Sequence, residues 1–225
     1  MTSSLVGSEM CIRDSTEYLP VSSSAHIRII GDLMLGADPG AAFTAIIQIG
    51  TELAVILYFR RDIINILSHW FGCLFGKNGP DWRARMGRGD KYATLGWNVI
   101  VGSIPIIILG FTLQNIIETS LRNLWITVTV LFLFGLLLWI VDARSRQIKT
   151  MDDMNYRDAF LFGLGQSMAL IPGVSRSGGT ITVGRALGYT RESAVRLSFL
   201  MAIPAVFGSC LLYTSPSPRD STSSR

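Results

Sequence analysis

The sequence predicts an all-α, polytopic integral membrane protein with two re-entrant helix hairpins in an inverted-repeat arrangement. Three observations predict this fold: long apolar segments, basic residues gathered in alternate connections, and two polar, serine-rich segments at membrane depth. Of the 225 residues, 49% are hydrophobic and 16% are charged, whereas roughly a quarter are charged in a typical soluble domain. This composition excludes a disordered chain, and a formal net charge of only +4 argues against a nucleic-acid-binding protein.

Apolar segments of the right length to cross a bilayer occur four times, since a helix needs about 20 residues to span roughly 30 Å of hydrocarbon. They are residues 41–59, 93–111, 124–141 and 193–213. The third segment carries no charge and has Trp125 and Trp139 near its ends, where aromatic rings favour the membrane interface. The shorter apolar run at 63–75 predicts a helix that lies in the interface.

The basic residues of the connections predict the orientation of these spans. Lys and Arg gather at residues 60–92 and 142–158, whereas residues 31–40 contain none and residues 112–123 contain only Arg122. Because basic residues in short loops stay on the cytoplasmic side, we expect the first two connections inside and the other two outside.

Two polar segments interrupt the apolar pattern, at residues 16–26 (TEYLPVSSSAH) and 163–180 (GLGQSMALIPGVSRSGGT). Each begins with an apolar residue before proline and continues into a serine-rich turn with one basic residue, His26 or Arg176. The flanking charges predict that the first segment enters from outside and the second from inside. Since the flanks are too short to cross, we interpret both as re-entrant hairpins of an inverted repeat that meet at a polar site.

The second polar segment has the chemistry of a phosphate or diphosphate site. Its glycines allow tight turns that present backbone N–H groups, its serines donate hydrogen bonds, and the planar fork of Arg176 matches phosphate oxygens. The first segment offers Glu17, Ser23 and His26, which suit a nucleophile with an acid/base partner or a metal ligand.

Purely structural interpretations remain open for several of these residues. Serines 22–24 also suit a close-packed helix interface, and His26 also suits a structural role. Gln48 and Glu52 lie four residues apart on one helix face. They either line the cavity or satisfy broken backbone. For Arg176 the structural alternative is weaker, because a charge within the membrane is costly.

At these polar residues the sequence resembles the bacterial undecaprenyl-diphosphatase family, the bacitracin-resistance type of membrane phosphatase. The resemblance rests on residues 16–26, 43–63, 163–182 and 198–204 and covers about residues 16–209. It implies metal-assisted hydrolysis of a polyprenyl diphosphate lipid carrier to its monophosphate, at the outer side of the bacterial cytoplasmic membrane. This reaction recycles the carrier for peptidoglycan synthesis and underlies bacitracin resistance.

The resemblance also implies roles for individual residues. Glu17 would be a catalytic acid or a ligand of Mg²⁺ or Ca²⁺, Ser23 the nucleophile or a phosphate contact, His26 the acid/base, and Arg176 the diphosphate clamp. Further expected substrate contacts are polar or glycine residues, namely Ser22, Ser24, Gln48, Gln166, Gly173, Ser175, Ser177, Gly178 and Thr180. The expected partners are the lipid substrate and the bilayer, with a homodimer as an option and no nucleic acid.

The two ends depart from the family pattern. Where the family has a second acidic residue four positions before Glu17, this sequence has Arg13, a cation that would impair metal binding. Residues 1–15 and 211–225 are polar where the family continues in apolar helices. We therefore expect both ends to be foreign to the gene, around a single phosphatase domain at residues 16–210 that is truncated at its C-terminus.

A transporter or flippase of an anionic lipid or phosphate compound is the alternative function. An inverted repeat with a polar site near the midplane is also the architecture of secondary transporters. Such a protein would move its substrate without cleaving a bond.

Overall fold

The computed structural model describes the backbone of residues 41–77, 79, 81–119 and 124–214, and the side chains of residues 50–77, 79, 81–112 and 125–208. Within these ranges the only β-type pairing is an isolated bridge between Lys149 and Tyr189, so the described chain is all-helical, as predicted. Its elements are α3 (Ala41–Tyr58), α4 (Arg60–Leu74), α5 (Trp82–Arg85), α6 (Lys91–Thr119), α7 (Leu124–Arg144), η1 (Met151–Asp153), α8 (Tyr156–Ser167), η2 (Met168–Leu170), α9 (Arg176–Ala186) and α10 (Arg191–Thr214).

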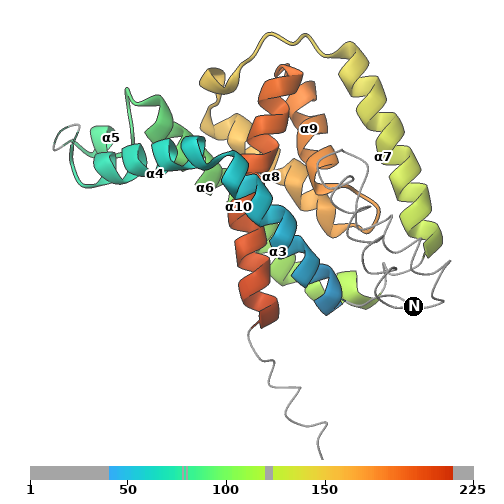
Figure 1. Cartoon of the computed structure of the whole chain (residues 1–225). Helices are drawn as coiled ribbons and strands as arrows, with labels where there is room; N and C mark the ends of the chain where they lie inside the picture. The colour runs from blue at the N-terminus through green and yellow to red at the C-terminus, as the bar shows by residue number, and fades with distance from the viewer. Residues whose placement is uncertain (1–40, 78, 80, 120–123, 215–225) are drawn as a thin grey trace, which may run out of the picture.

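The four apolar segments all form helices, which are α3, α6, α7 and α10. In the described part, α6 and α7 each contain a stretch long and apolar enough to cross a membrane, Lys91–Thr112 and Trp125–Arg144. The apolar run at 63–75 falls largely in α4, which continues from the end of α3 and packs against the first part of α6 (Figure 1). Trp70 of α4 contacts Trp97 of α6 edge-on, with ring centroids 5.4 Å apart.

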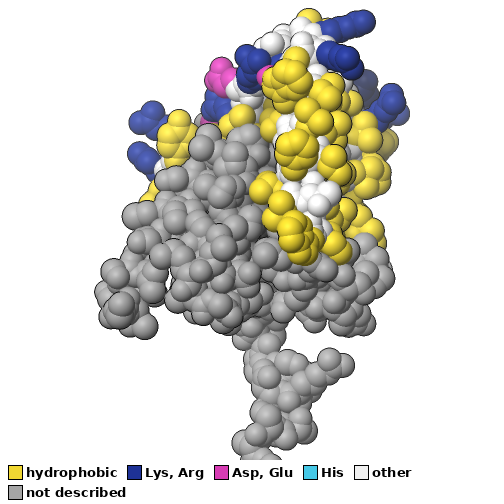
Figure 2. Space-filling model, turned by 90° about the vertical axis from the view of Figure 1, so that its right-hand side faces the viewer, with side chains coloured by type: hydrophobic (Ala, Val, Ile, Leu, Met, Phe, Trp, Pro, Cys, Tyr) yellow, Lys and Arg dark blue, Asp and Glu magenta, His cyan; other side chains and the backbone are white. Residues whose placement is uncertain are grey.

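One face of the molecule is suited to lipid. On α7, Trp125, Phe132 and Trp139 are 79%, 71% and 69% exposed. In Figure 2, apolar side chains form a strip on this side of the molecule, with basic side chains gathered at its upper end. Water would solvate such a face poorly, because large contiguous apolar patches are rare on soluble monomers.

Ion pairs join the predicted inside connections at the basic end. Asp142 at the end of α7 contacts Arg185 at 2.5 Å and Arg191 at 2.7 Å. At the same end, Arg196 of α10 contacts Asp62 of α4 at 2.7 Å. The segments at 60–92, 142–158 and 184–196 therefore meet at one end of the fold, as their charges predict.

Tyr189, which follows α9, connects that end of the helix to the first turn of α8. Its hydroxyl donates to Asp158 at 2.8 Å, and Lys149 contacts the same carboxylate at 2.8 Å. Burial, followed by the hydrogen bond to Asp158, raises the pKa of Tyr189 above its ordinary value. The phenol therefore stays neutral and remains a donor at physiological pH.

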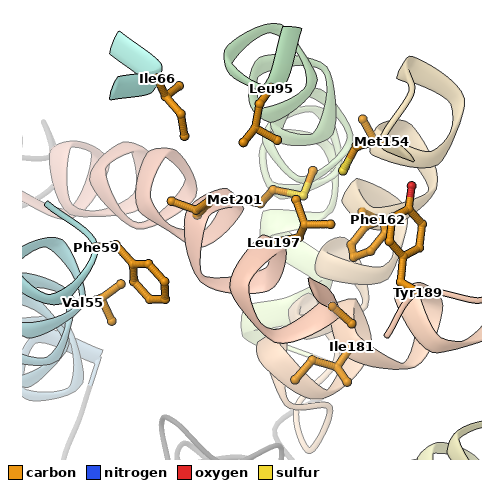
Figure 3. Packing of buried hydrophobic residues seen from close by; sticks show 13 residues of the cluster. Val55, Phe59, Ile66, Leu95, Met154, Phe162, Ile181, Tyr189, Leu197 and Met201 are labelled. Carbon is orange, nitrogen blue, oxygen red and sulfur yellow. The ribbon is translucent and has the colours of Figure 1, made fainter. Parts of the chain in front are cut away.

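The core lies where α6, α8, α9 and α10 pack together (Figure 3). Phe162 of α8 is fully buried and contacts the ring of Tyr189 edge-on, with ring centroids 5.3 Å apart. Leu197 and Met201 of α10 are also fully buried, and Ile181 of α9 completes this part of the cluster. These side chains hold α8 and α9 in place, and those two helices carry the second polar segment.

The contact between α6 and α8 depends on Gly102 and Gly163, whose backbones touch. A Cβ atom added to Gly163 would overlap the carbonyl oxygen of Gly102 and would also meet the carbonyl carbon at 2.9 Å. Because all of these atoms belong to backbone, only a shift of a whole helix would relieve the overlap.

We predict that Gly163→Ala destabilises the fold by about 1–3 kcal/mol, the usual cost of overpacking a core. Gly135→Ala on α7 is the matched control, because no heavy atom lies within 4 Å of the added methyl group. Thermal unfolding of the purified protein in detergent measures both variants. Equal melting temperatures for the two variants would contradict the close α6–α8 contact.

Candidate anion-binding site

The second polar segment forms a helix, a turn and a second helix. α8 ends at Ser167, the short helix η2 follows, and the chain reverses through Pro172 and Gly173 before α9 begins at Arg176. Gly173 has φ +102°, and a Cβ atom there would overlap the carbonyl oxygen of Thr127 on α7. Only glycine satisfies both the backbone angle and the close contact, so this residue fixes the turn that leads into α9.

Ser175 caps the N-terminus of α9. Its hydroxyl accepts a hydrogen bond from the N–H of Gly178 at 3.2 Å and lies 3.1 Å from the hydroxyl of Ser177. Serine is among the preferred residues at this position. The cap places Arg176 and Ser177 in the first turn of α9, at the positive end of the helix dipole, where anions are favoured.

Across this turn, Arg176 faces α3. Its guanidinium nitrogen lies 3.7 Å from a carboxylate oxygen of Glu52 in α3, and the side chains are 19% and 6% exposed. The site therefore joins two segments more than 120 residues apart in the sequence, with a buried carboxylate beside the arginine that the sequence singles out.

The described structure places the other predicted contacts of this segment around the same turn. Thr180 is fully buried, and its hydroxyl donates to the carbonyl oxygen of Arg176 at 2.7 Å. Gln166 is also fully buried, and its amide donates to the carbonyl oxygen of Met201 at 3.3 Å. The hydrogen bond of Thr180 lies within α9, which carries Arg176, whereas that of Gln166 joins α8 to α10.

The first polar segment lies outside the described residues. This applies to the predicted contacts Glu17, Ser22, Ser23, Ser24 and His26. Gln48 belongs to α3, but its side chain is also outside the described part. The roles assigned to these residues stay predictions.

A divalent cation needs several oxygen ligands, and the described residues contain no group of three or more His, Cys, Asp or Glu side chains that could hold one. Glu52, the carboxylate beside Arg176, already contacts a guanidinium. Glu17, the predicted ligand, lies outside the described residues, so the site for Mg²⁺ or Ca²⁺ stays a prediction.

Sequence reasoning identified Arg176 and the glycines and serines around it, but it missed the pairing of Arg176 with Glu52. The available signal was an acidic residue within an apolar helix, which is rare without a partner. No pattern in the sequence says which basic residue faces it.

The described part of the chain is all-helical, with an apolar face on α7 and an arginine at the capped N-terminus of α9. These features are those of a membrane-type protein with a candidate anion-binding site. Residues 11–224 match the family model described as bacitracin resistance protein BacA. The chain therefore belongs to the BacA family, which confirms the resemblance seen in the sequence.

Named relatives agree with this assignment. The chain is 88% identical over 199 residues to an undecaprenyl-diphosphatase of Bifidobacterium longum subsp. infantis, an alignment that covers 88% of this chain and 68% of the relative. It is 69% identical to the protein of the same name from Bifidobacterium adolescentis, over 91% of this chain and 70% of the relative. It is 54% identical to the undecaprenyl-diphosphatase of Paenarthrobacter aurescens, over 89% of this chain and 70% of the relative.

We predict that Ser175→Ala lowers the stability of the protein by about 1 kcal/mol, because the N–H of Gly178 loses its acceptor. Ser175→Asp should retain most of the stability, since aspartate also caps helices and favours the positive end of the dipole. Thermal unfolding of both variants tests the cap. A Ser175→Ala variant that melts like the unmodified protein would show that the cap does not stabilise α9.

Proposed function

We propose that this chain is an undecaprenyl-diphosphate phosphatase that releases phosphate from the polyprenyl diphosphate carrier and leaves the monophosphate. The observation that carries the proposal is the 88% identity, over 88% of the chain, to a relative named undecaprenyl-diphosphatase. The position of Arg176 at the capped start of α9 supports it, because that position suits a diphosphate. Its proposed role is recycling of the carrier for peptidoglycan synthesis, and with it bacitracin resistance.

The proposed reaction divides the work between the two polar segments. Hydrolysis forms a bond from an attacking oxygen to the terminal phosphorus and breaks the bond from that phosphorus to the bridging oxygen, which leaves with the electron pair on the monophosphate. Arg176 and the first turn of α9 would stabilise the charge that develops on these oxygens. Ser175 and Ser177 would add hydroxyl contacts.

The proton transfers fall to the first polar segment in this proposal. His26 and Glu17 would take a proton from Ser23 or from water and return it to the products, as general base and acid. When bound, Mg²⁺ or Ca²⁺ held by Glu17 would supply Lewis-acid stabilisation of the phosphate oxygens.

The orientation in the membrane follows from the basic end, which in this proposal faces the cytoplasm of the bacterial inner membrane. With 12 and 11 residues, α8 and α9 would be roughly 18 Å and 16 Å long, too short to cross about 30 Å of hydrocarbon. These lengths support the proposed re-entrant hairpin, which would open the site to the outer side. Assembly as a homodimer is compatible with this arrangement.

Arg176→Ala tests the role of the arginine. We expect the rate of phosphate release from a long-chain polyprenyl diphosphate, with Mg²⁺ or Ca²⁺ present, to fall at least about a hundredfold, the usual effect of removing a group that stabilises developing charge. Arg157→Ala is the matched control, because Arg157 is exposed in the first turn of α8. Near-normal turnover by Arg176→Ala would refute the assignment of the arginine.

The same assay separates the phosphatase from the transporter alternative. A phosphatase releases inorganic phosphate from detergent-solubilised lipid, where no membrane separates two compartments. A flippase would release none, but would move labelled lipid between the leaflets of a reconstituted vesicle. Lipid movement without phosphate release would favour the alternative.

A further inference from the structure

We propose that Glu52 is a built-in counter-ion that pairs with Arg176 before the substrate binds and yields it to the phosphate groups of the substrate. Glu52 would thereby weaken the hold of the site on anions and speed the release of the phosphate product. The identity of the substrate rests on the proposed function, whereas the exchange of one anion for another at Arg176 is measurable without turnover.

The geometry of the pair suits exchange. The 3.7 Å between the Arg176 nitrogen and the Glu52 oxygen exceeds the 2.7–2.9 Å that is typical of charge-assisted hydrogen bonds. The contact is thus an attraction between charges and not a bidentate pair. Exchange of this one contact for a contact with a phosphate therefore breaks no pair of parallel hydrogen bonds between Arg176 and Glu52.

Glu52 is the fixed partner of the two. It is followed one turn later on the same helix face by Val55, which is buried in the core, and Phe59 of the next turn packs against Phe199 of α10 with ring centroids 6.0 Å apart. The opposite face of α3 is exposed, with Leu53 56% and Leu57 55% accessible. Glu52 therefore points into the protein from an anchored helix.

Arg176 is the more exposed partner and lies at the start of its helix. Its long side chain can change direction while the capped backbone of α9 stays in place. The movable charge is therefore the one that meets the anion, and the buried carboxylate stays behind.

The charge of Glu52 opposes any anion bound to Arg176. In a partly buried site such repulsion is stronger than in water, because the effective dielectric constant is lower. A carboxylate within several ångströms of the phosphate would lower its affinity about tenfold or more. Binding that is equally tight for substrate and transition state does not speed the chemical step, and product release limits the turnover of many enzymes.

Glu52→Gln tests this inference, because it removes the charge and keeps the shape of the side chain. Isothermal titration of the purified chain with methylenediphosphonate, whose P–C–P bridge cannot be hydrolysed, gives the anion affinity. We expect Glu52→Gln to bind at least about tenfold more tightly than the unmodified chain. Inorganic phosphate should show the same trend.

Asp62→Asn is the matched control. It also removes a carboxylate from an ion pair with arginine, but at the basic end of the molecule, where Asp62 contacts Arg196 at 2.7 Å. Its affinity for methylenediphosphonate should equal that of the unmodified chain.

Should Glu52→Gln fail to fold, Glu52→Asp provides the test instead. Its shorter side chain moves the carboxylate away from the anion. We therefore expect Glu52→Asp to bind methylenediphosphonate about threefold more tightly than the unmodified chain.

The kinetic constants of Glu52→Gln provide a second test, because a merely structural role of Glu52 would not change KM and kcat in the expected way. With polyprenyl diphosphate, Glu52→Gln should lower both KM and kcat, because substrate and product are both held more tightly. Unchanged or weaker anion binding in Glu52→Gln, or no binding of methylenediphosphonate by either protein, would overturn the inference.

The outcomes keep the two proposals apart. Tighter binding by Glu52→Gln without any phosphate release would support the counter-ion and refute the phosphatase. Phosphate release together with unchanged anion affinity would do the reverse.

Discussion

The contact of Gly173 with the backbone of α7 is the constraint on which the site depends. The chain must reverse between α8 and α9 in an apolar setting, and the turn is held against the carbonyl oxygen of Thr127. Because Gly173 fixes the turn, Ser175 lies where it caps α9, and Arg176 is the first residue of that helix. A side chain at position 173 would push the whole segment away from α7.

The same physical problem recurs at both ends of the fold, because charges within an apolar protein need partners. At the basic end, the fully buried Arg185 is paired with Asp142. At the other end of α9, Arg176 faces Glu52. The first pair is a short contact that locks connections together, whereas the second is longer and suits a side chain that exchanges partners. One helix thus carries a structural arginine at one end and, at the other, the arginine of the candidate site.

Close helix packing makes this arrangement rigid. The backbones of α6 and α8 touch at Gly102 and Gly163, and Phe162 of α8 packs edge-on against the ring of Tyr189. A rigid support matters for a site that acts through electrostatics, since donors that are already in place cost no reorganisation during the reaction. Large apolar side chains of α7 are exposed on the outside, whereas polar side chains such as Gln166, Thr180 and Arg185 are buried inside.

The sequence by itself determined the helical class, the four apolar helices and the end of the fold where basic residues gather, and it predicted a turn within residues 163–180. These features depend on local composition and on the spacing of apolar residues, both of which can be read directly from the sequence. Only the tertiary structure decided that Glu52 faces Arg176, that Gly163 lies against Gly102, and that the hydroxyl of Thr180 is used by the helix itself. Such contacts join residues far apart in the chain or depend on side-chain direction, and no local pattern specifies either.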